Sequence, residues 1–255
     1  LLHATAIAAQ CIHGDPCPEV RALESSDCTA YHIFAARGSD SKYPGHLGHL
    51  MKLICDNIDD SCSYEDIIYP ANSSQAGPNM WCKSAAIGVE NGQAQMTEYS
   101  KRCPFPESKL ILLGYSQGAS VSLDILGGGG ANVPWPVNPC EQQNNPALDR
   151  STAPGANIVA AAVFGAVVRS GGQPYSVKGG AKYNGTSPRT DEHLLGLDQF
   201  ANDGIIRDYC NNGDFVCARD STPEDLNQHL NYFDLYTEEA AEWVVNTAQN
   251  TTGRS

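Results

Sequence analysis

The segment Gly114-Tyr-Ser116-Gln-Gly118 has the spacing of a serine nucleophile held in a sharp turn. It follows an apolar run over 110–113, and a helical pattern begins directly after it. A strand, a tight turn and a helix form the context in which a G-x-S-x-G motif exposes a reactive hydroxyl, and the helix N-terminus favours negative charge there. The motif therefore predicts Ser116 as a nucleophile. The alternative is a tight turn with an incidental serine.

A serine hydroxyl is a weak nucleophile until a base accepts its proton. In folds with this motif the acid and the histidine follow the serine along the chain, and only His193 and His229 do so. His193 precedes the last predicted strand, whereas His229 lies after it and just before a C-terminal helix. His229 is therefore the predicted base. The spacing of His46 and His49 could hold a metal ion, but a solvated helix face accounts for it, and we expect no metal.

The acid must lie between Ser116 and His229, on a loop at the end of a strand. Asp214 fits best, because it lies in the segment Cys210-Asn-Asn-Gly-Asp-Phe-Val-Cys217 directly after a predicted strand. A disulfide across that segment would hold the carboxylate in place and contribute roughly 2.5 kcal/mol in the chain-entropy model. A turn residue after Gly213 is the alternative role for Asp214. Four other aspartates remain competitors for the acid: Asp203, Asp208, Asp220 and Asp225.

Two hydrogen-bond donors must face the oxyanion that forms when a serine attacks an ester carbonyl. One is the backbone N–H of the residue after the nucleophile, Gln117. The other should come from the loop after an early strand, where the sequence reads Ala35-Ala-Arg-Gly-Ser39-Asp. We therefore predict that Ser39 and Gln117 form the oxyanion hole.

Short apolar runs alternate with helical patterns along the chain. Strands are predicted at 31–36, 65–69, 109–113, 157–164 and 204–209, and helices at 48–56, 84–99, 117–126 and 236–248. The runs lack a polar alternation, as strands covered on both faces do. This order predicts an α/β fold, a three-layer sandwich with a mainly parallel sheet of about five strands and helices on both faces. No element is predicted over 127–153, which carries four glycines and several prolines.

The composition excludes some classes of partner. The chain has 255 residues, a hydrophobic fraction of 41% and a formal net charge of −13. A single catalytic domain over 1–255 is expected, with an N-terminal extension over about 1–27 and a core over about 28–248. Nucleic-acid binding needs a cationic surface, so we expect no nucleic-acid partner. We also expect a monomer.

Ten cysteines indicate an oxidising compartment, because free thiols are kept reduced in the cytosol. Sequons for N-glycosylation begin at Asn72, Asn184 and Asn250. The chain starts at Leu1, and the small apolar stretch Leu1–Gln10 lacks a basic region, so we interpret it as a processed N-terminus. The longest later apolar stretch, 158–168, is too short to span a bilayer. These features predict a secreted, extracellular, disulfide-bonded glycoprotein.

Four motifs together resemble the cutinase and acetylxylan esterase family, carbohydrate esterase family five. They are Phe34-Ala-Ala-Arg-Gly-Ser39, the Ser116 motif, the 210–217 segment and His229-Leu-Asn-Tyr232. The resemblance extends over about 28–245. It implies a lidless α/β-hydrolase fold and cofactor-free ester hydrolysis by Ser116, His229 and Asp214, with Ser39 and Gln117 as the oxyanion hole. It also implies the disulfides Cys28–Cys103 and Cys210–Cys217, and leaves open the pairing of Cys11, Cys17, Cys55, Cys62, Cys82 and Cys140.

Within this resemblance two substrate classes compete. Family members often have Gly-Asp-Pro after the fourth strand, whereas this chain reads Gly165-Ala-Val-Val168. Tyr43-Pro-Gly45 and the Gly127–Gly130 run are closer to acetylxylan esterases, and His229-Leu230 is closer to cutinases. The site loops carry polar residues and suggest no apolar rim. We therefore favour short acyl esters, such as acetyl groups on xylan, over a cutinase-type polyester. A catalytically silent protein of the same fold that binds carbohydrate is a third reading.

Overall fold

The computed structural model describes residues 17–251, and six of the strands in that range form one parallel sheet. The sheet order is β2 (Cys62–Asp66), β1 (Tyr31–Ala36), β3 (Lys109–Tyr115), β6 (Ile158–Phe164), β8 (Ile206–Tyr209) and β7 (Ser176–Val177). Every neighbouring pair is parallel. All residues of β1 and β6 are buried, as expected for strands covered on both faces. Cys11 and the apolar stretch at 1–10 lie outside the described residues.

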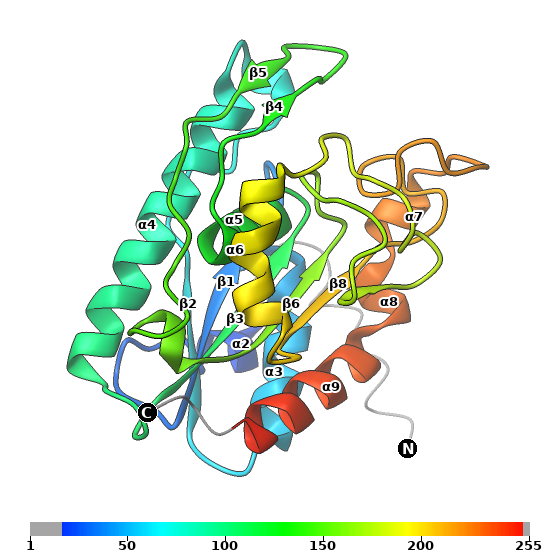
Figure 1. Cartoon of the computed structure of the whole chain (residues 1–255). Coiled ribbons are helices and arrows are strands. Elements are labelled where there is room, and N and C mark those ends of the chain that lie inside the picture. Colours follow the sequence, from blue (N-terminus) through cyan, green and yellow to red (C-terminus); the bar gives the residue numbers. More distant parts are fainter. Residues whose placement is uncertain (1–16, 252–255) are drawn as a thin grey trace, which may run out of the picture.

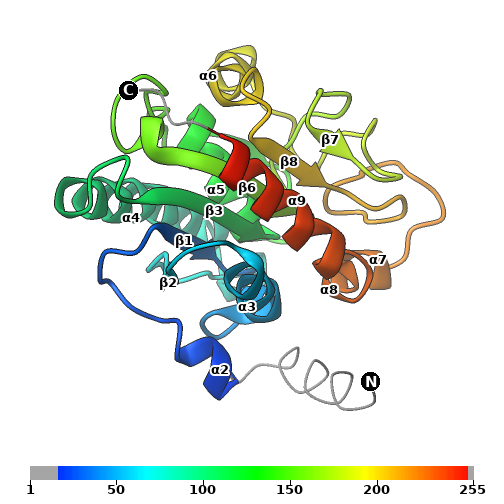
Figure 2. The same ribbon diagram turned by 90° about the horizontal axis from the view of Figure 1, so that it is seen from below.

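Helices cover both faces of the sheet (Figures 1 and 2). One face packs against α3 (Gly48–Asn57) and α9 (Thr237–Asn250), and the other against α4 (Met80–Arg102), α5 (Gln117–Gly127) and α6 (Asp191–Ala201). Alternate residues of β1 show this division, because Phe34 belongs to the core on the α4 side whereas Ile33 and Ala35 belong to the core on the α3 side. The predicted α/β-hydrolase-type sandwich is confirmed, with six strands rather than about five.

The remaining elements are short and belong to the segments that connect the long helices and strands. They are α2 (Pro18–Arg21), α7 (Asn227–Leu230), α8 (Tyr232–Leu235), the two-residue strands β4 (Asn132–Val133) and β5 (Cys140–Glu141), and 3₁₀ turns at Gly45–Leu47, Ser74–Ala76 and Gly155–Asn157. β4 and β5 pair antiparallel, so the prediction of no element over 127–153 was wrong at this point.

The predicted position of the second strand was also wrong. The apolar run at 65–69 suggested the strand, but β2 spans Cys62–Asp66, where it pairs with β1 from Tyr31 to Ala35. β2 ends the row of strands, and on its outer side Tyr64 bridges to Glu24. Its polar residues are accommodated in two ways: Glu65 is half-buried, and the buried Ser63 hydroxyl lies 2.8 Å from His32 Nδ1. The chain stays extended past Asp66, because Ile67 N–H still donates to Ala35 O at 2.9 Å.

Helix α6 was missed in the sequence. Thr190 caps it, because the Thr190 hydroxyl accepts a hydrogen bond from the His193 backbone N–H at 3.3 Å. Gly196 lies inside the helix, where glycine lowers helix propensity. The structure explains that glycine, since a Cβ at Gly196 would overlap the backbone of Gly127 at the end of α5. The glycine permits the close crossing of α5 and α6.

Four disulfides join described cysteines. Cys28–Cys103 and Cys210–Cys217 are the pairs that the family resemblance implies, and Cys55–Cys62 and Cys82–Cys140 are two further pairs. Cys17 is also disulfide-bonded. Cys82–Cys140 joins the first turn of α4 to β5 and so ties the 127–153 segment to the body of the fold.

Candidate active site

Ser116 occupies the turn between β3 and α5 with φ 55° and ψ −116°. A positive φ is strained for a side-chain-bearing residue, and the surrounding structure must hold it there. Two glycines allow the turn. A Cβ at Gly118 would overlap Ala36 O at the end of β1, and a Cβ at Gly114 would overlap Gly118 O. The G-x-S-x-G spacing therefore has a steric origin, and it presents the Ser116 side chain at the carboxyl edge of the sheet.

The structure brings Ser116, His229 and Asp214 into one hydrogen-bonded chain. Ser116 Oγ lies 3.0 Å from His229 Nε2, and His229 Nδ1 lies 2.9 Å from Asp214 Oδ2. The three residues come from the start of α5, from α7 and from the loop after β8. Because 113 and 15 residues separate the partners, only the sheet topology can assemble them.

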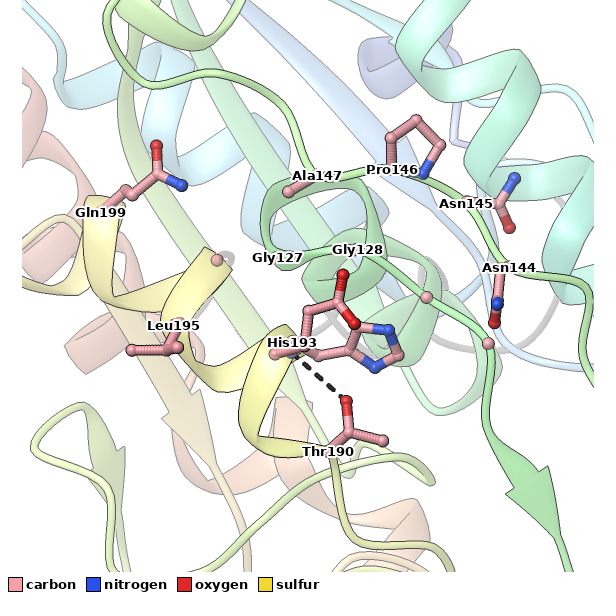
Figure 3. Close-up of a pocket in the computed structure, with 14 residues that line it drawn as sticks. Gly127, Gly128, Asn144, Asn145, Pro146, Ala147, Thr190, His193, Leu195 and Gln199 are labelled. Atoms are coloured by element: carbon pink, nitrogen blue, oxygen red, sulfur yellow. Dashed lines mark hydrogen bonds between the residues drawn. The ribbon is translucent and has the colours of Figure 1, made fainter.

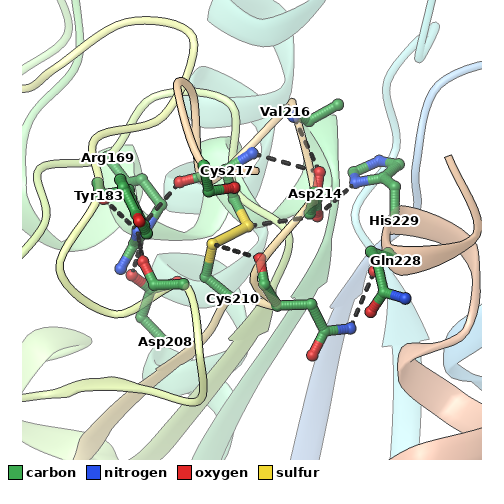
Figure 4. The surroundings of a disulfide bond; sticks show 12 residues. Arg169, Tyr183, Asp208, Cys210, Asp214, Val216, Cys217, Gln228 and His229 are labelled. Carbon is green, nitrogen blue, oxygen red and sulfur yellow. Dashed lines mark hydrogen bonds and ion pairs between the residues drawn. A yellow bond between two sulfur atoms is a disulfide. The ribbon is translucent and has the colours of Figure 1, made fainter. Parts of the chain in front are cut away.

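Asp214 is fully buried, and both of its carboxylate oxygens accept hydrogen bonds. Oδ1 accepts from the backbone N–H of Val216 at 2.8 Å (Figure 4). Oδ2 accepts from His229 and also from the Tyr232 hydroxyl at 2.7 Å. Burial alone would raise the pKa of Asp214. The hydrogen bond and the charge of His229, together with hydrogen bonds from the Tyr232 hydroxyl and the Val216 backbone N–H, bring that pKa below its usual value. The carboxylate is thus held ionised beside the imidazole.

The competing aspartates lie elsewhere. Asp208 forms a buried ion pair with Arg169 at 2.7 Å, and Asp203 pairs with Arg150 at 2.9 Å. Asp220 is exposed. Asp225 accepts a hydrogen bond from the backbone N–H of Asn227 at 3.0 Å. Of the five candidates, only Asp214 forms a hydrogen bond with the imidazole of His229.

A buried arginine, which no sequence motif had singled out, supports the loop that carries Asp214. Arg169 Nε donates to Asp208 Oδ2 on β8, and its Nη1 donates to Cys217 O at 3.0 Å and to Tyr183 O at 2.6 Å (Figure 4). One guanidinium therefore joins the strand, the far end of the disulfide loop and the 171–184 segment. Tyr232 belongs to the motif His229-Leu-Asn-Tyr232, but the sequence likewise predicted no role for its side chain.

The position of His229 is fixed from two sides. The Tyr115 hydroxyl donates to the His229 carbonyl at 2.7 Å, and the two rings stack with centroids 5.3 Å apart. Gly165, with φ 64°, lies under the imidazole, because a Cβ there would come within 2.9 Å of His229 Cε1. The segment Gly165-Ala-Val-Val168 differs from the Gly-Asp-Pro that family members often have after β6, but it retains the glycine that makes room for the His229 imidazole.

The loop after β1 reaches the nucleophile as expected. A Cβ at Gly38 would lie 3.5 Å from Ser116 Cβ, so the backbone that leads into the half-buried Ser39 passes beside the nucleophile. The Gln117 side chain is occupied elsewhere, since Nε2 donates to Asn72 O at 3.0 Å and to Trp81 O at 3.2 Å. This leaves the Gln117 backbone N–H, one of the first amides of α5, which has no acceptor within the helix.

Exposed apolar side chains occur in the two segments that carry Asp214 and His229. Phe215 follows Asp214 and is 39% exposed, and Leu226 and Leu230 on either side of His229 are 54% and 49% exposed. The sequence reasoning weighed the polar residues of these loops and overlooked the apolar ones between them. These three side chains are therefore candidates for an apolar rim that the sequence analysis did not consider.

The other singled-out residues lie apart from this site or at its margin. His193 lies in α6 beside Gly128, at the far end of α5 from Ser116. The His46 ring packs 5.0 Å from Tyr115, and no cluster of metal-ligating side chains occurs among residues 17–251. Of the sequon asparagines, Asn184 and Asn250 are exposed, whereas Asn72 is half-buried next to Gln117.

Comparisons with known proteins identify the family. The cutinase family profile matches residues 27–248, so the chain belongs to the cutinase family and is a carboxylic ester hydrolase. It is 29% identical over 221 residues to an acetylxylan esterase of Hypocrea jecorina, covering 85% of this chain and 67% of the relative. It is 26% identical over 226 residues to cutinase 11 of Verticillium dahliae, covering 87% and 70%.

A solved structure agrees with that assignment. The catalytic core domain of acetyl xylan esterase from Trichoderma reesei superposes with a TM-score of 0.69 at 25% identity, covering 87% of this chain and all of that chain. The esterase fold and class are thus established, while neither relative fixes which ester this chain hydrolyses. Within residues 17–251, no helix has the length and apolar character needed to cross a membrane.

Proposed function

We propose that this protein is a secreted serine esterase in which Ser116 is the nucleophile, His229 the general base and Asp214 the orienting acid. The observation that carries the proposal is the continuous chain of hydrogen bonds, 3.0 Å from Ser116 Oγ to His229 Nε2 and 2.9 Å from His229 Nδ1 to Asp214 Oδ2. The cysteines paired in disulfides and the exposed sequons at Asn184 and Asn250 support secretion.

The geometry supports a two-step reaction. His229 accepts the Ser116 proton as Oγ attacks the ester carbonyl, and Asp214 stabilises the imidazolium that forms. The oxyanion of the tetrahedral intermediate is placed against the backbone N–H of Gln117 and against Ser39. His229 then gives its proton to the departing alcohol, leaving an acyl-Ser116 ester. Water, deprotonated by His229, hydrolyses that ester and releases the acid.

The nucleophile is tested by substitution and by labelling. Ser116→Ala should lower kcat/KM on p-nitrophenyl acetate by at least about 10⁴-fold while the circular dichroism spectrum stays as in the wild type. A phosphonate ester should add to wild-type Ser116, detected by peptide mass spectrometry. A folded Ser116→Ala protein with near wild-type activity would sink the assignment. An unlabelled wild-type protein without activity would favour the silent carbohydrate-binding protein.

For the substrate we propose acetyl or other short acyl esters on a plant cell-wall polysaccharide such as xylan. The relatives named acetylxylan esterase support it, and so does the polar character of the loops around Ser39 and Asn211. The expected result is that kcat/KM on p-nitrophenyl esters is highest from acetate to butyrate and falls by octanoate. The protein should also release acetate from acetylated xylan.

A cutinase-type polyester or lipid ester is the second candidate, favoured by the exposed Phe215, Leu226 and Leu230 beside His229. One CH₂ buried on an apolar surface contributes about 0.8 kcal/mol, so kcat/KM would rise up to about fourfold per added carbon. The double variant Leu226→Ser, Leu230→Ser discriminates the two. It should lower the octanoate-to-acetate ratio only if those side chains bind the acyl chain, and a rising acyl series without acetate release from xylan would establish the second candidate.

A further inference from the structure

A cavity of about 690 Å³ lies at the end of α5 that is remote from Ser116. Because α5 has 11 residues and each step along it rises 1.5 Å, its last residue lies about 15 Å along the helix axis from its first. We call this cavity the glycine groove. Its floor is Gly127–Gly130, one wall is the segment 144–147, and the other wall is the face of α6 from Thr190 to Gln199 (Figure 3). Its volume is within the range of small-molecule sites.

The floor of the glycine groove can carry no side chains. A Cβ at Gly127 would lie 2.5 Å from Leu197 Cγ, and a Cβ at Gly130, which has φ 132°, would overlap the Asn144 side chain. At Gly129 the floor is hydrogen-bonded to the wall, since its N–H and C=O each pair with the Asn145 backbone at 3.0 Å. The glycines thus allow α6 and the 144–147 segment to approach the floor closely, so that the floor of the groove is backbone.

A buried network supports that floor from below. Arg189 Nη2 and Asp124 Oδ1 form an ion pair of 2.7 Å in which both side chains are 1% exposed. Gln142 Nε2 donates to the other carboxylate oxygen at 2.8 Å, and Arg189 Nη1 donates to Gly128 O at 3.3 Å. Both charges are used within the fold, so the groove is preformed and the arginine contributes little net charge to it.

The walls offer neutral hydrogen-bonding groups together with apolar patches. Asn144 carries an amide with a donor and an acceptor end, and Thr190 carries a hydroxyl. Gln199 offers its amide NH₂ group, because its Oε1 accepts a hydrogen bond from the Arg150 backbone N–H at 3.5 Å. Burial and the neighbouring Arg189 lower the pKa of His193, which favours the neutral ring with one donor and one acceptor nitrogen. Leu195, 68% exposed, supplies an apolar surface. This mixture fits a polyhydroxylated ligand whose C–H faces are apolar.

The charge of the site excludes anionic ligands. No lysine or arginine is among the residues that line the glycine groove, and Glu192 adds a carboxylate. The whole chain carries a formal net charge of −13, which would repel a phosphate or a uronic-acid polymer. A neutral polyol is the ligand class that matches the uncharged hydrogen-bonding groups and the apolar surface of the walls.

We propose that the glycine groove binds a short, neutral stretch of polysaccharide backbone, separately from the site where the ester is cleaved. This inference rests on the proposed function, because its use is to hold an ester-bearing polymer on the enzyme. A polymer attached at the groove presents its esters to Ser116 at a raised effective concentration. Binding at the groove should therefore raise kcat/KM for the polymer, whereas kcat/KM for small soluble esters should not depend on the groove.

Direct binding is measured by isothermal titration of the wild-type protein with unacetylated xylohexaose, which contains no ester. The double variant His193→Ala, Gln199→Ala removes hydrogen-bonding groups from the α6 wall and should weaken affinity about tenfold. The control Glu98→Ala changes an exposed residue of α4 outside the groove and should bind as the wild type does. Absence of wild-type binding at millimolar xylohexaose, or equal affinity in the double variant, overturns the proposal.

A kinetic test separates the groove from the esterase. The ratio of kcat/KM for acetate release from acetylated xylan to kcat/KM for p-nitrophenyl acetate should fall about fivefold in the double variant, through KM for the polymer. The ratio should hold in Glu98→Ala. An unchanged ratio in the double variant counts against the proposal. If the wild type fails to hydrolyse p-nitrophenyl acetate, the proposed function is wrong, and the xylohexaose titration still decides on the groove.

Discussion

Two loops of the molecule are closed by disulfides of the same sequence separation, 7, and they lie at opposite edges of the sheet. Cys55–Cys62 joins the end of α3 to the start of β2, and Cys210–Cys217 closes the loop that follows β8. In the first loop the carboxylates of Asp59 and Asp60 are exposed to solvent. In the second, Asp214 is buried and both of its oxygens accept hydrogen bonds.

The difference shows what a disulfide contributes and what it does not. In the chain-entropy model, the two bonds restrict loops of equal length and so contribute equally to the free energy of unfolding. Orientation of the carboxylate comes from the hydrogen bonds inside the loop and from Tyr232 and Arg169 outside it. The comparison therefore separates closing a loop from positioning a charge within it.

The largest expected effect comes from exchanging the carboxylate in each loop for an amide. Asp214→Asn should lower kcat by about 10⁴-fold, because an amide does not enforce the imidazole tautomer that accepts the Ser116 proton. Asp59→Asn, in the matched loop, should keep kcat within about twofold, since surface substitutions are nearly neutral. Steady-state kinetics on p-nitrophenyl acetate measures both. If Asp220→Asn instead is the damaging change, the acid lies on the other side of Cys217.

Removing each disulfide should affect stability alike and activity differently. Two double variants each remove one bond: the first is Cys210→Ala with Cys217→Ala, and the second is Cys55→Ala with Cys62→Ala. Each should reduce the free energy of unfolding by roughly 2.5 kcal/mol, measured by urea denaturation. Only the first double variant should lower kcat, by about 10²-fold, because small misplacement of an orienting group is costly. Equal kcat in the two double variants would show that Tyr232 and Arg169 position Asp214 without the disulfide.

Tyr232 sharpens the comparison, since it acts on the carboxylate from outside the loop. Tyr232→Phe removes the hydroxyl that donates to Asp214 Oδ2 and should lower kcat about tenfold with KM unchanged. The matched control is Tyr236→Phe, which removes a 2.7 Å hydrogen bond to Asn211 in the same loop but none to the carboxylate. A loss of kcat that is equal in both variants would indicate general loosening of the loop rather than positioning of Asp214.

The sequence predicted those parts that local patterns encode. The G-x-S-x-G spacing, the buried runs of β1 and β6, and the order of serine, acid and histidine follow from turn sterics and from the parallel sheet. The position of β2 was not predictable from hydrophobicity, because β2 accommodates the polar Ser63 and Glu65. Helix α6 contains Gly196, which lowers helix propensity and whose role depends on a contact with α5.

Long-range polar contacts account for the rest. Arg169 reaches partners 39 and 48 residues away, and Tyr232 reaches Asp214 over 18 residues, so neither has a local signature. The glycine groove likewise combines three segments from 127 to 199. The exposed Leu226 and Leu230 differ from these long-range contacts, because they lie next to His229 in the sequence and could have been considered from the sequence alone.

The smallest expected effect is the dependence of stability on acid pH. The pKa of Asp214 is lower in the folded protein than in the unfolded chain, where a carboxyl of this type titrates near 3.9. Its charge therefore stabilises the fold above that pH, and this contribution is lost as the pH falls through the folded-state pKa. Asp214→Asn lacks the proton-binding group, so the gap between wild-type and variant urea midpoints should be wide at pH 5 and narrower at pH 2.5. A constant gap would mean that folding does not shift the pKa of Asp214, and a gap that widens towards acid would mean that folding raises it; either result would contradict a carboxylate held ionised beside His229.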